Sequence, residues 1–196
     1  LKSTVSWRTK LIWLRSDLRL HDNTALSAAA SRGPSVAVYL LSPEQWREHD
    51  DAPCKVDFWL RNLRELSRTL GELNIPLLIR MASRWDEAPK VLLDLCQQLK
   101  IDAVHVNEEY GIDESRRDAA VADALKTKGI DFYSDLDQLL FKPGTVLTKT
   151  GTYFQFFSQF RKVCYDRLRS SLPSLGSAPM AQARVTVDSD EIRSSV

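Results

Sequence analysis

Short apolar segments alternate with longer segments of helical periodicity along most of this chain, and this alternation limits the folds that it can adopt. Five segments are typical of buried strands: Lys10–Leu14, Val36–Leu41, Pro76–Met81, Asp102–Val106 and Ile130–Tyr133. Five others are typical of helices: residues 23–30, 55–73, 85–99, 113–128 and 152–169. Strands that alternate with helices form right-handed crossovers and a parallel sheet covered on both faces. The sequence therefore predicts an α/β fold with a five-stranded, Rossmann-like parallel sheet.

The loops that follow the strands are the expected place for a ligand. In open parallel sheets a ligand lies beyond the carboxyl ends of the strands, near the point where the strand order reverses. Residues 15–22, 42–54, 82–84 and 107–112 share that end of the predicted sheet. We read residues 42–53 as a polar loop without helix.

The loop after the first strand carries alternating charges in the stretch WLRSDLRLHDN. Asp17, Arg19 and Asp22 are best explained as a network that holds this loop in place, because each charge has a partner nearby. Arg15 lies nearest the strand end and remains a candidate for binding an anionic ligand. The loop contains no glycine, which argues against the glycine-rich loop that cradles a dinucleotide phosphate.

Two further loops carry candidate site residues. In PEQWREHD, Trp46 offers an aromatic face for stacking, and His49 can donate or accept a hydrogen bond. In NEEYGIDESRRD, several carboxylates precede or open a helix. We expect Asp113 or a neighbour to be the N-cap of this helix, whereas Glu114 could serve either the helix or a ligand.

Charge and cysteine content exclude several classes of protein. The formal net charge is +1, which argues against a strong electrostatic nucleic-acid binder. No apolar run reaches the length of a membrane span. The three cysteines and three histidines are scattered, so neither a disulfide framework nor a metal site is expected. Free thiols are typical of a reducing compartment inside the cell.

Four motifs in this order resemble the N-terminal domain of the DNA photolyase and cryptochrome family. They are WLRSDLRLHDNTAL, PLLIR, NEEYGIDESRRD and LFKPGTVLTKTGTYFQFFSQFRK. The resemblance covers about residues 10–170 and is nearest to the bacterial-type class I photolyases that repair cyclobutane pyrimidine dimers. It implies an α/β antenna domain at residues 10–170, with residues 1–9 as an extension. Residues 171–196 would be a linker or tail towards a further domain.

The family implies a division of labour between two domains. The N-terminal domain holds an antenna chromophore, often methenyltetrahydrofolate and sometimes a deazaflavin or a flavin. A helical C-terminal domain holds FAD, binds damaged DNA and splits the dimer with light energy. That second domain has no counterpart in these 196 residues, so we expect this chain alone not to repair DNA.

The resemblance also implies roles for particular residues. Folate-binding members use a loop histidine, which matches His49, and an Asn-Glu pair, which matches Asp113 and Glu114. Asp113 departs from the family pattern, because an ionised carboxylate accepts hydrogen bonds but does not donate them. These members also use a lysine from the other domain. We expect the aromatic helix at residues 152–169 to pack partly on the sheet and partly on that domain.

Two other functions fit the same residues. A cryptochrome photoreceptor would signal instead of repairing, and the difference would lie in the C-terminal domain. A photolyase-like module without a chromophore could instead bind an adenine nucleotide, but the absence of a glycine-rich phosphate loop counts against this. The compartment could be the cytoplasm, the nucleus or a plastid, and the oligomeric state is open.

Overall fold

A computed structural model describes residues 8–192 and shows a single five-stranded parallel sheet. The strands lie in the order β3-β2-β1-β4-β5. Their bounds are β1 Lys10–Leu14, β2 Ser35–Leu41, β3 Leu77–Met81, β4 Ala103–Asn107 and β5 Asp131–Asp135. All four neighbouring pairs are parallel. The predicted α/β fold is confirmed, and the strand order reverses beside β1.

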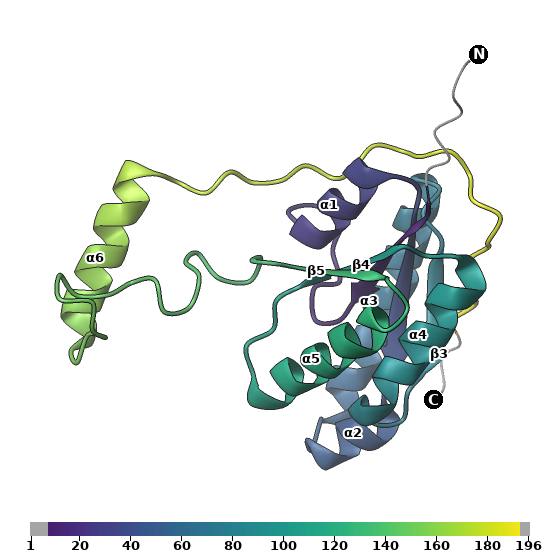
Figure 1. The fold of residues 1–196 in the computed structure, drawn as a ribbon, viewed down its shortest axis with the longest axis horizontal. Coiled ribbons are helices and arrows are strands. Elements are labelled where there is room, and N and C mark those ends of the chain that lie inside the picture. The colour runs from purple at the N-terminus through teal and green to yellow at the C-terminus, as the bar shows by residue number, and fades with distance from the viewer. Residues whose placement is uncertain (1–7, 193–196) are drawn as a thin grey trace.

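The helices connect the strands and cover the sheet (Figure 1). They are α1 Thr24–Arg32, α2 Pro43–Glu48, α3 Pro53–Glu72, α4 Ala88–Leu99, α5 Ile112–Lys126 and α6 Phe157–Ser170, with a short 3₁₀ turn, η1, at Trp85–Glu87. Helices α1 and α3 pack on one face, and α4 and α5 pack on the other. None of these helices of the described chain is long and apolar enough to cross a membrane.

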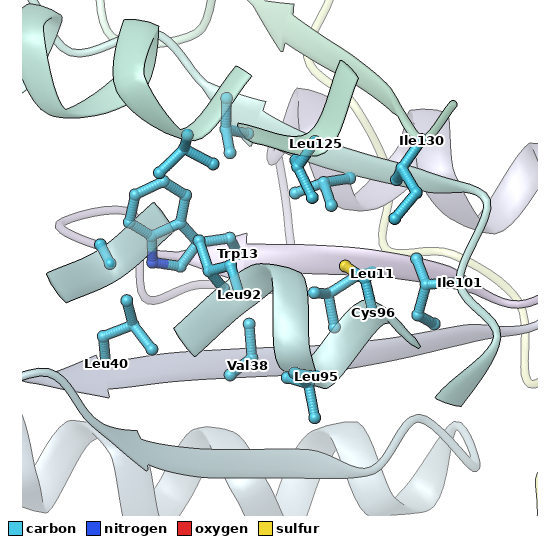
Figure 2. Packing of buried hydrophobic residues seen from close by; sticks show 14 of the residues in the cluster. Leu11, Trp13, Val38, Leu40, Leu92, Leu95, Cys96, Ile101, Leu125 and Ile130 are labelled. Atoms are coloured by element: carbon cyan, nitrogen blue, oxygen red, sulfur yellow. The ribbon is translucent and has the colours of Figure 1, made fainter. Parts of the chain in front are cut away.

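The central strand β1 supplies side chains to both layers of the core. Leu11 and Trp13 point towards α4 and α5, whereas Ile12 and Leu14 point towards α1 and α3. Successive side chains of a strand point to opposite faces, so a strand covered on both faces is apolar throughout. Figure 2 shows the first of these layers, in which Trp13 packs near Leu92.

Two local predictions were wrong. Residues 42–53 are not a simple loop, because Pro43 opens the short helix α2 and Trp46 is buried beneath it. Proline is well suited to the first turn of a helix, where its missing N–H leaves no bond unmade. Asp113 is not an N-cap. Helix α5 begins at Ile112 with Gly111 as its cap, and Asp113 lies in the first turn, paired with Arg116 at 3.3 Å.

Helix α6 was expected to pack partly on the sheet, and this too was wrong. No residue of α6 is buried. The chain after β5 leads away from the sheet, and α6 stands apart from the other helices (Figure 1). Its apolar face contacts the preceding segment, where residues 138–144, Val146 and Tyr153 line a shared hollow with Phe157 and Phe160.

The segment after α6 has no regular secondary structure, but it runs back across the domain (Figure 1). We call residues 176–192 the strap. Its first contact is with the loop after β1, where the Asp22 and Gly176 backbones are joined by a hydrogen bond of 2.8 Å. Val185 and Val187 then pack against one layer of the core, and Ile192 packs against the other.

Candidate functional site

A cavity of about 230 Å³ opens at the carboxyl ends of β1 and β2. Four tryptophans line it, and each comes from a different element: Trp13 from β1, Trp46 from α2, Trp59 from α3 and Trp85 from η1. The rings of Trp46 and Trp59 lie 5.9 Å apart. Large flat side chains around a hollow favour a flat aromatic ligand, because such rings stack.

Four of the five predicted site residues meet at this cavity. Arg15, Trp46, His49 and Glu114 all line it. Asp113 does not. Its side chain is 61% exposed and lines a neighbouring groove of about 450 Å³. The cavity and the groove adjoin each other, since His49, Trp85 and Arg117 line both.

Arg117 is a site residue that the sequence reasoning missed. Its buried guanidinium lies 4.9 Å from the ring centroid of Trp13 and 4.7 Å from that of Trp85. It pairs with Glu109 and Asp118, each at 2.7 Å. Arg117 shares the buried face of α5 with Val121 and Leu125, at a spacing of four residues. An arginine on an otherwise apolar stripe was the signal that could have identified it.

The charges around Arg117 balance one another inside the cavity wall. Burial of Glu109 opposes its ionisation, but Arg15 and Arg117 outweigh this effect and hold the pKa of Glu109 below its usual value. Glu109 also accepts a hydrogen bond from Ser16 at 2.6 Å. A buried carboxylate with two guanidinium neighbours is ionised at neutral pH. The positive and negative charges in the wall are therefore paired, and they do not require a bound ion for balance.

Arg15 is committed mainly to the fold. It pairs with Asp118 at 3.2 Å, donates to the carbonyl of Asn107, and lies 4.7 Å from the ring centroid of Trp13. Its Nε atom is buried and has no partner among the described residues. That N–H is therefore a donor of Arg15 that a ligand in the cavity could use.

The rest of the charged loop after β1 is structural, as predicted. Asn107 donates to Asp17 at 2.6 Å and to Asn23 at 2.8 Å, and all three side chains are buried. Arg19 pairs with Asp137 at 2.6 Å. These bonds tie β1, α1 and β4 together beneath the site.

Gln45, which sequence reasoning did not single out, orients His49. The Oε1 atom of Gln45 accepts the backbone N–H of Trp85 at 3.2 Å, which leaves its amide nitrogen 3.0 Å from Nε2 of His49. An amide nitrogen donates, so Nε2 of His49 is the acceptor in this contact. The His49 ring also meets Trp85 edge-on at 4.9 Å. The four-residue spacing of Gln45 and His49 becomes informative only once α2 is known to be a helix.

Two further residues, Glu114 and Tyr39, line the cavity. Glu114 is half-buried at the start of α5, and its carboxylate folds back over Gly111. Tyr39, at the carboxyl end of β2, also lines the cavity. Burial raises the pKa of Tyr39 strongly, and nearby carboxylates add to the effect. Its hydroxyl therefore keeps its proton and can donate a hydrogen bond.

Comparisons with known proteins agree with this architecture. The sequence profile of the DNA photolyase family matches residues 10–179. The chain is 37% identical over 154 residues to the deoxyribodipyrimidine photo-lyase of Vibrio cholerae. The aligned segment covers 78% of this chain and 33% of that protein.

Solved structures show the same fold. A cryptochrome from Synechocystis superimposes with a TM-score of 0.77 at 20% identity, over 94% of this chain and 39% of that one. An archaeal photolyase from Sulfolobus tokodaii, solved with two FAD molecules, has a TM-score of 0.69 at 23% identity, over 93% and 38%. The chain thus spans between a third and two fifths of the length of these proteins.

Proposed function

The chain belongs to the DNA photolyase family, and from this premise we propose that it is the domain that holds a light-absorbing antenna chromophore. The observation that supports this proposal is the cavity at the carboxyl edge of the sheet, which is lined by four tryptophans, His49 and Glu114. Aromatic walls bind the faces of a fused heterocycle, and a few polar groups set its orientation. This combination suits a chromophore better than it suits a phosphate.

The size of the cavity suggests how such a molecule would lie. Ligand sites usually enclose about 300–1,000 Å³, and the cavity encloses about 230 Å³. The adjoining groove offers about 450 Å³ more. We place the ring system in the cavity and the polar tail in the groove, where Asp113 and Arg116 would meet the tail.

Methenyltetrahydrofolate is the first candidate chromophore. Its pterin ring carries amide and amine groups that a carboxylate and a histidine can bind, and Glu114 and His49 are both at the cavity. A flavin or deazaflavin is the alternative. The Sulfolobus tokodaii photolyase supports it, because that protein holds two FAD molecules, which imply a novel light-harvesting cofactor there.

The chain's relatives indicate the reaction of a longer protein. The Vibrio cholerae relative is a deoxyribodipyrimidine photo-lyase, and this chain matches only a third of it. We propose that the antenna passes its excitation to FAD in a C-terminal domain, which splits pyrimidine dimers in damaged DNA. The 196-residue chain would absorb light and would not repair DNA alone.

Helix α6 is the surface proposed to meet that C-terminal domain. Its residue Phe157 is 71% exposed and lines a hollow with Leu140, Tyr153 and Phe160. Isolated helices of this length are only marginally stable in water and gain most of their stability from packing an apolar face. An exposed aromatic face of this kind marks an interaction site.

A cryptochrome is the second candidate for the longer protein. The Synechocystis cryptochrome has the same fold over almost the whole of this chain. The antenna proposal is common to both candidates. Dimer repair by a protein of full family length would decide for the photolyase, and its absence for the cryptochrome.

The test of the antenna proposal is binding of methenyltetrahydrofolate, and in parallel of a flavin, followed by the chromophore's own absorbance. His49→Ala and Glu114→Ala should lose the shifted absorbance band. His21→Ala is the matched control, because His21 is exposed and does not line the cavity. If neither chromophore binds, or if all three variants behave alike, the proposed site is wrong.

A further inference from the structure

Several charged side chains that line the cavity are already engaged with one another. Arg117 pairs with Glu109 at 2.7 Å, and Lys55 pairs with Asp51 at 2.6 Å. Ser16 donates to Glu109 at 2.6 Å. A group whose hydrogen bonds are made within the protein gains little from a ligand. The groups that select a ligand are therefore those left without a partner.

Two polar side chains of the cavity wall are buried and still have a hydrogen to donate. Arg15 is 8% exposed and Tyr39 is 7% exposed, and both line the cavity. Nε of Arg15 has no partner among the described residues. The Tyr39 hydroxyl makes no hydrogen bond within residues 8–192. Buried polar groups without a partner are rare and costly, so two of them at one cavity point to a ligand that completes their bonds.

The two donors approach the cavity from neighbouring strands. Tyr39 belongs to β2 and is the register partner of Leu14, the last residue of β1, which Arg15 follows. Leu14 and Tyr39 pack in the layer of α1 and α3. Arg15 instead lies over the ring of Trp13, which packs in the layer of α4 and α5. The donors therefore belong to opposite walls of the cavity.

Neither group is satisfied by a donor on the ligand. The Nε–H of Arg15 donates and never accepts. Burial raises the pKa of Tyr39 well above its usual value, and nearby carboxylates, chiefly Glu109, add to the effect. The hydroxyl therefore keeps its proton. If it only accepted a hydrogen bond from the ligand, its own hydrogen would remain without a partner. Both groups thus require an acceptor atom.

We propose that Tyr39 and Arg15 select a heterocycle that presents carbonyl oxygens to them, and that they reject a ring of the same shape with amines in those positions. This inference rests on the proposed chromophore site and narrows its ligands to oxo-substituted rings. A site built to hydrogen-bond one group rejects an analogue that lacks it, because buried protein groups are then left unpaired. Adenine, whose exocyclic group is an amine, would be rejected on this ground.

The test compares folic acid with aminopterin, which carries an amine in place of the ring carbonyl. Both are titrated into the complete chain at mildly alkaline pH, where neither ring is protonated. Folic acid should bind about tenfold more tightly or better. Tyr39→Phe removes only the hydroxyl, so it should weaken folic acid binding and leave aminopterin binding unchanged. Tyr165→Phe is the matched control, since Tyr165 is exposed on α6 and does not line the cavity.

Arg15→Lys provides a second measurement, since lysine keeps a cation beside Asp118 but has no Nε–H. It too should reduce the preference for folic acid. An undiminished preference in both variants would overturn the inference. Equal binding of the two compounds, with His49 and Glu114 still required, would overturn it and leave the proposed chromophore site standing. If neither compound binds, the inference is wrong, and if flavins also fail to bind, the proposed function is wrong with it.

Discussion

The carboxylate of Glu114 lies directly over the backbone of Gly111. A Cβ atom at position 111 would approach the Oε2 and Cδ atoms of Glu114 to less than 3.0 Å. The backbone of Gly111 is extended, at φ −68° and ψ 156°, which any residue can adopt. What Gly111 provides is therefore the space that the Glu114 carboxylate occupies, and not conformational freedom.

Gly111→Ala should weaken chromophore binding about tenfold, which corresponds to the loss of a well-placed hydrogen bond. The new methyl group would displace the Glu114 carboxylate from its position without removing it. The measurement is a binding titration followed by chromophore absorbance. Gly71→Ala is the control, since a Cβ there would meet nothing within 4 Å. Equal binding by the two variants would show that the position of Glu114 does not matter.

Acid should destabilise the domain through His105. This residue is fully buried on β4, neither ring nitrogen has a partner among the described residues, and its ring stacks on Tyr133 at 4.8 Å. Burial, followed by the charges of Arg32 and Lys10, lowers the pKa of His105 from 6.5 to about 4, although Asp102 opposes this. The folded state thus favours the neutral ring.

The sign of the effect follows from that shift. The unfolded chain binds the proton more tightly, so the stability contribution is complete above about pH 6.5 and is lost as the pH falls towards 4. The loss amounts to about 3 kcal/mol. Urea unfolding at about pH 7 and about pH 4.5 measures it. His105→Leu should reduce the difference between the two pH values, and an undiminished difference would assign the acid sensitivity to other groups.

Removal of Arg117 should destabilise the domain strongly. Arg117→Leu would remove the ion-pair partner of Glu109 and would leave Asp118 with Arg15 alone, both in a largely buried wall. Breaking a buried ion pair from one side costs about 3–5 kcal/mol. Arg116→Leu should cost less than about 0.5 kcal/mol, because its side chain is 78% exposed. The midpoint of urea unfolding measures both, and a small effect at Arg117 would mean that the two carboxylates are solvated.

Phe157→Gln should leave the stability of the 196-residue chain within about 0.5 kcal/mol, because the side chain is already in water. Leu63→Ala, in the core under α3, should cost about 2–5 kcal/mol. In a protein of full family length, Phe157→Gln should become clearly destabilising, since the proposal places this residue in a domain interface. Thermal unfolding of both lengths tests this, and equal shifts in the two would contradict the interface.

The sheet could be predicted because parallel strands covered on both faces must be apolar, and such runs are visible in a sequence. Helix α2 could not be predicted in this way, because its single buried aromatic residue, Trp46, lies among charged residues. The aromatic side chains of α6 indicated that something covers them, but no pattern says which surface does so. The contacts of the strap residues Gln182 and Asp190 with the backbones of Ser35 and Ile79 were equally hidden, because polar side chains that bind a distant backbone leave no periodic pattern.

The candidate site, too, could be predicted only in part from the sequence. Trp46, His49 and Glu114 were found through motifs in separate loops, and the sheet brings them together. Arg117 and Gln45 act through other residues, so their importance depends on distances that only the folded chain has. Asp113 was one residue from Glu114 in sequence, yet the turn of the helix directs it to the outer groove.

All four tryptophans between residues 8 and 192 belong to the walls of one cavity. The ultraviolet emission of this part of the folded chain therefore originates almost entirely beside the proposed ligand. A ring that enters the cavity would quench that emission, and its departure would restore it. The domain thus contains its own optical probe, with which occupancy can be followed in real time without a label.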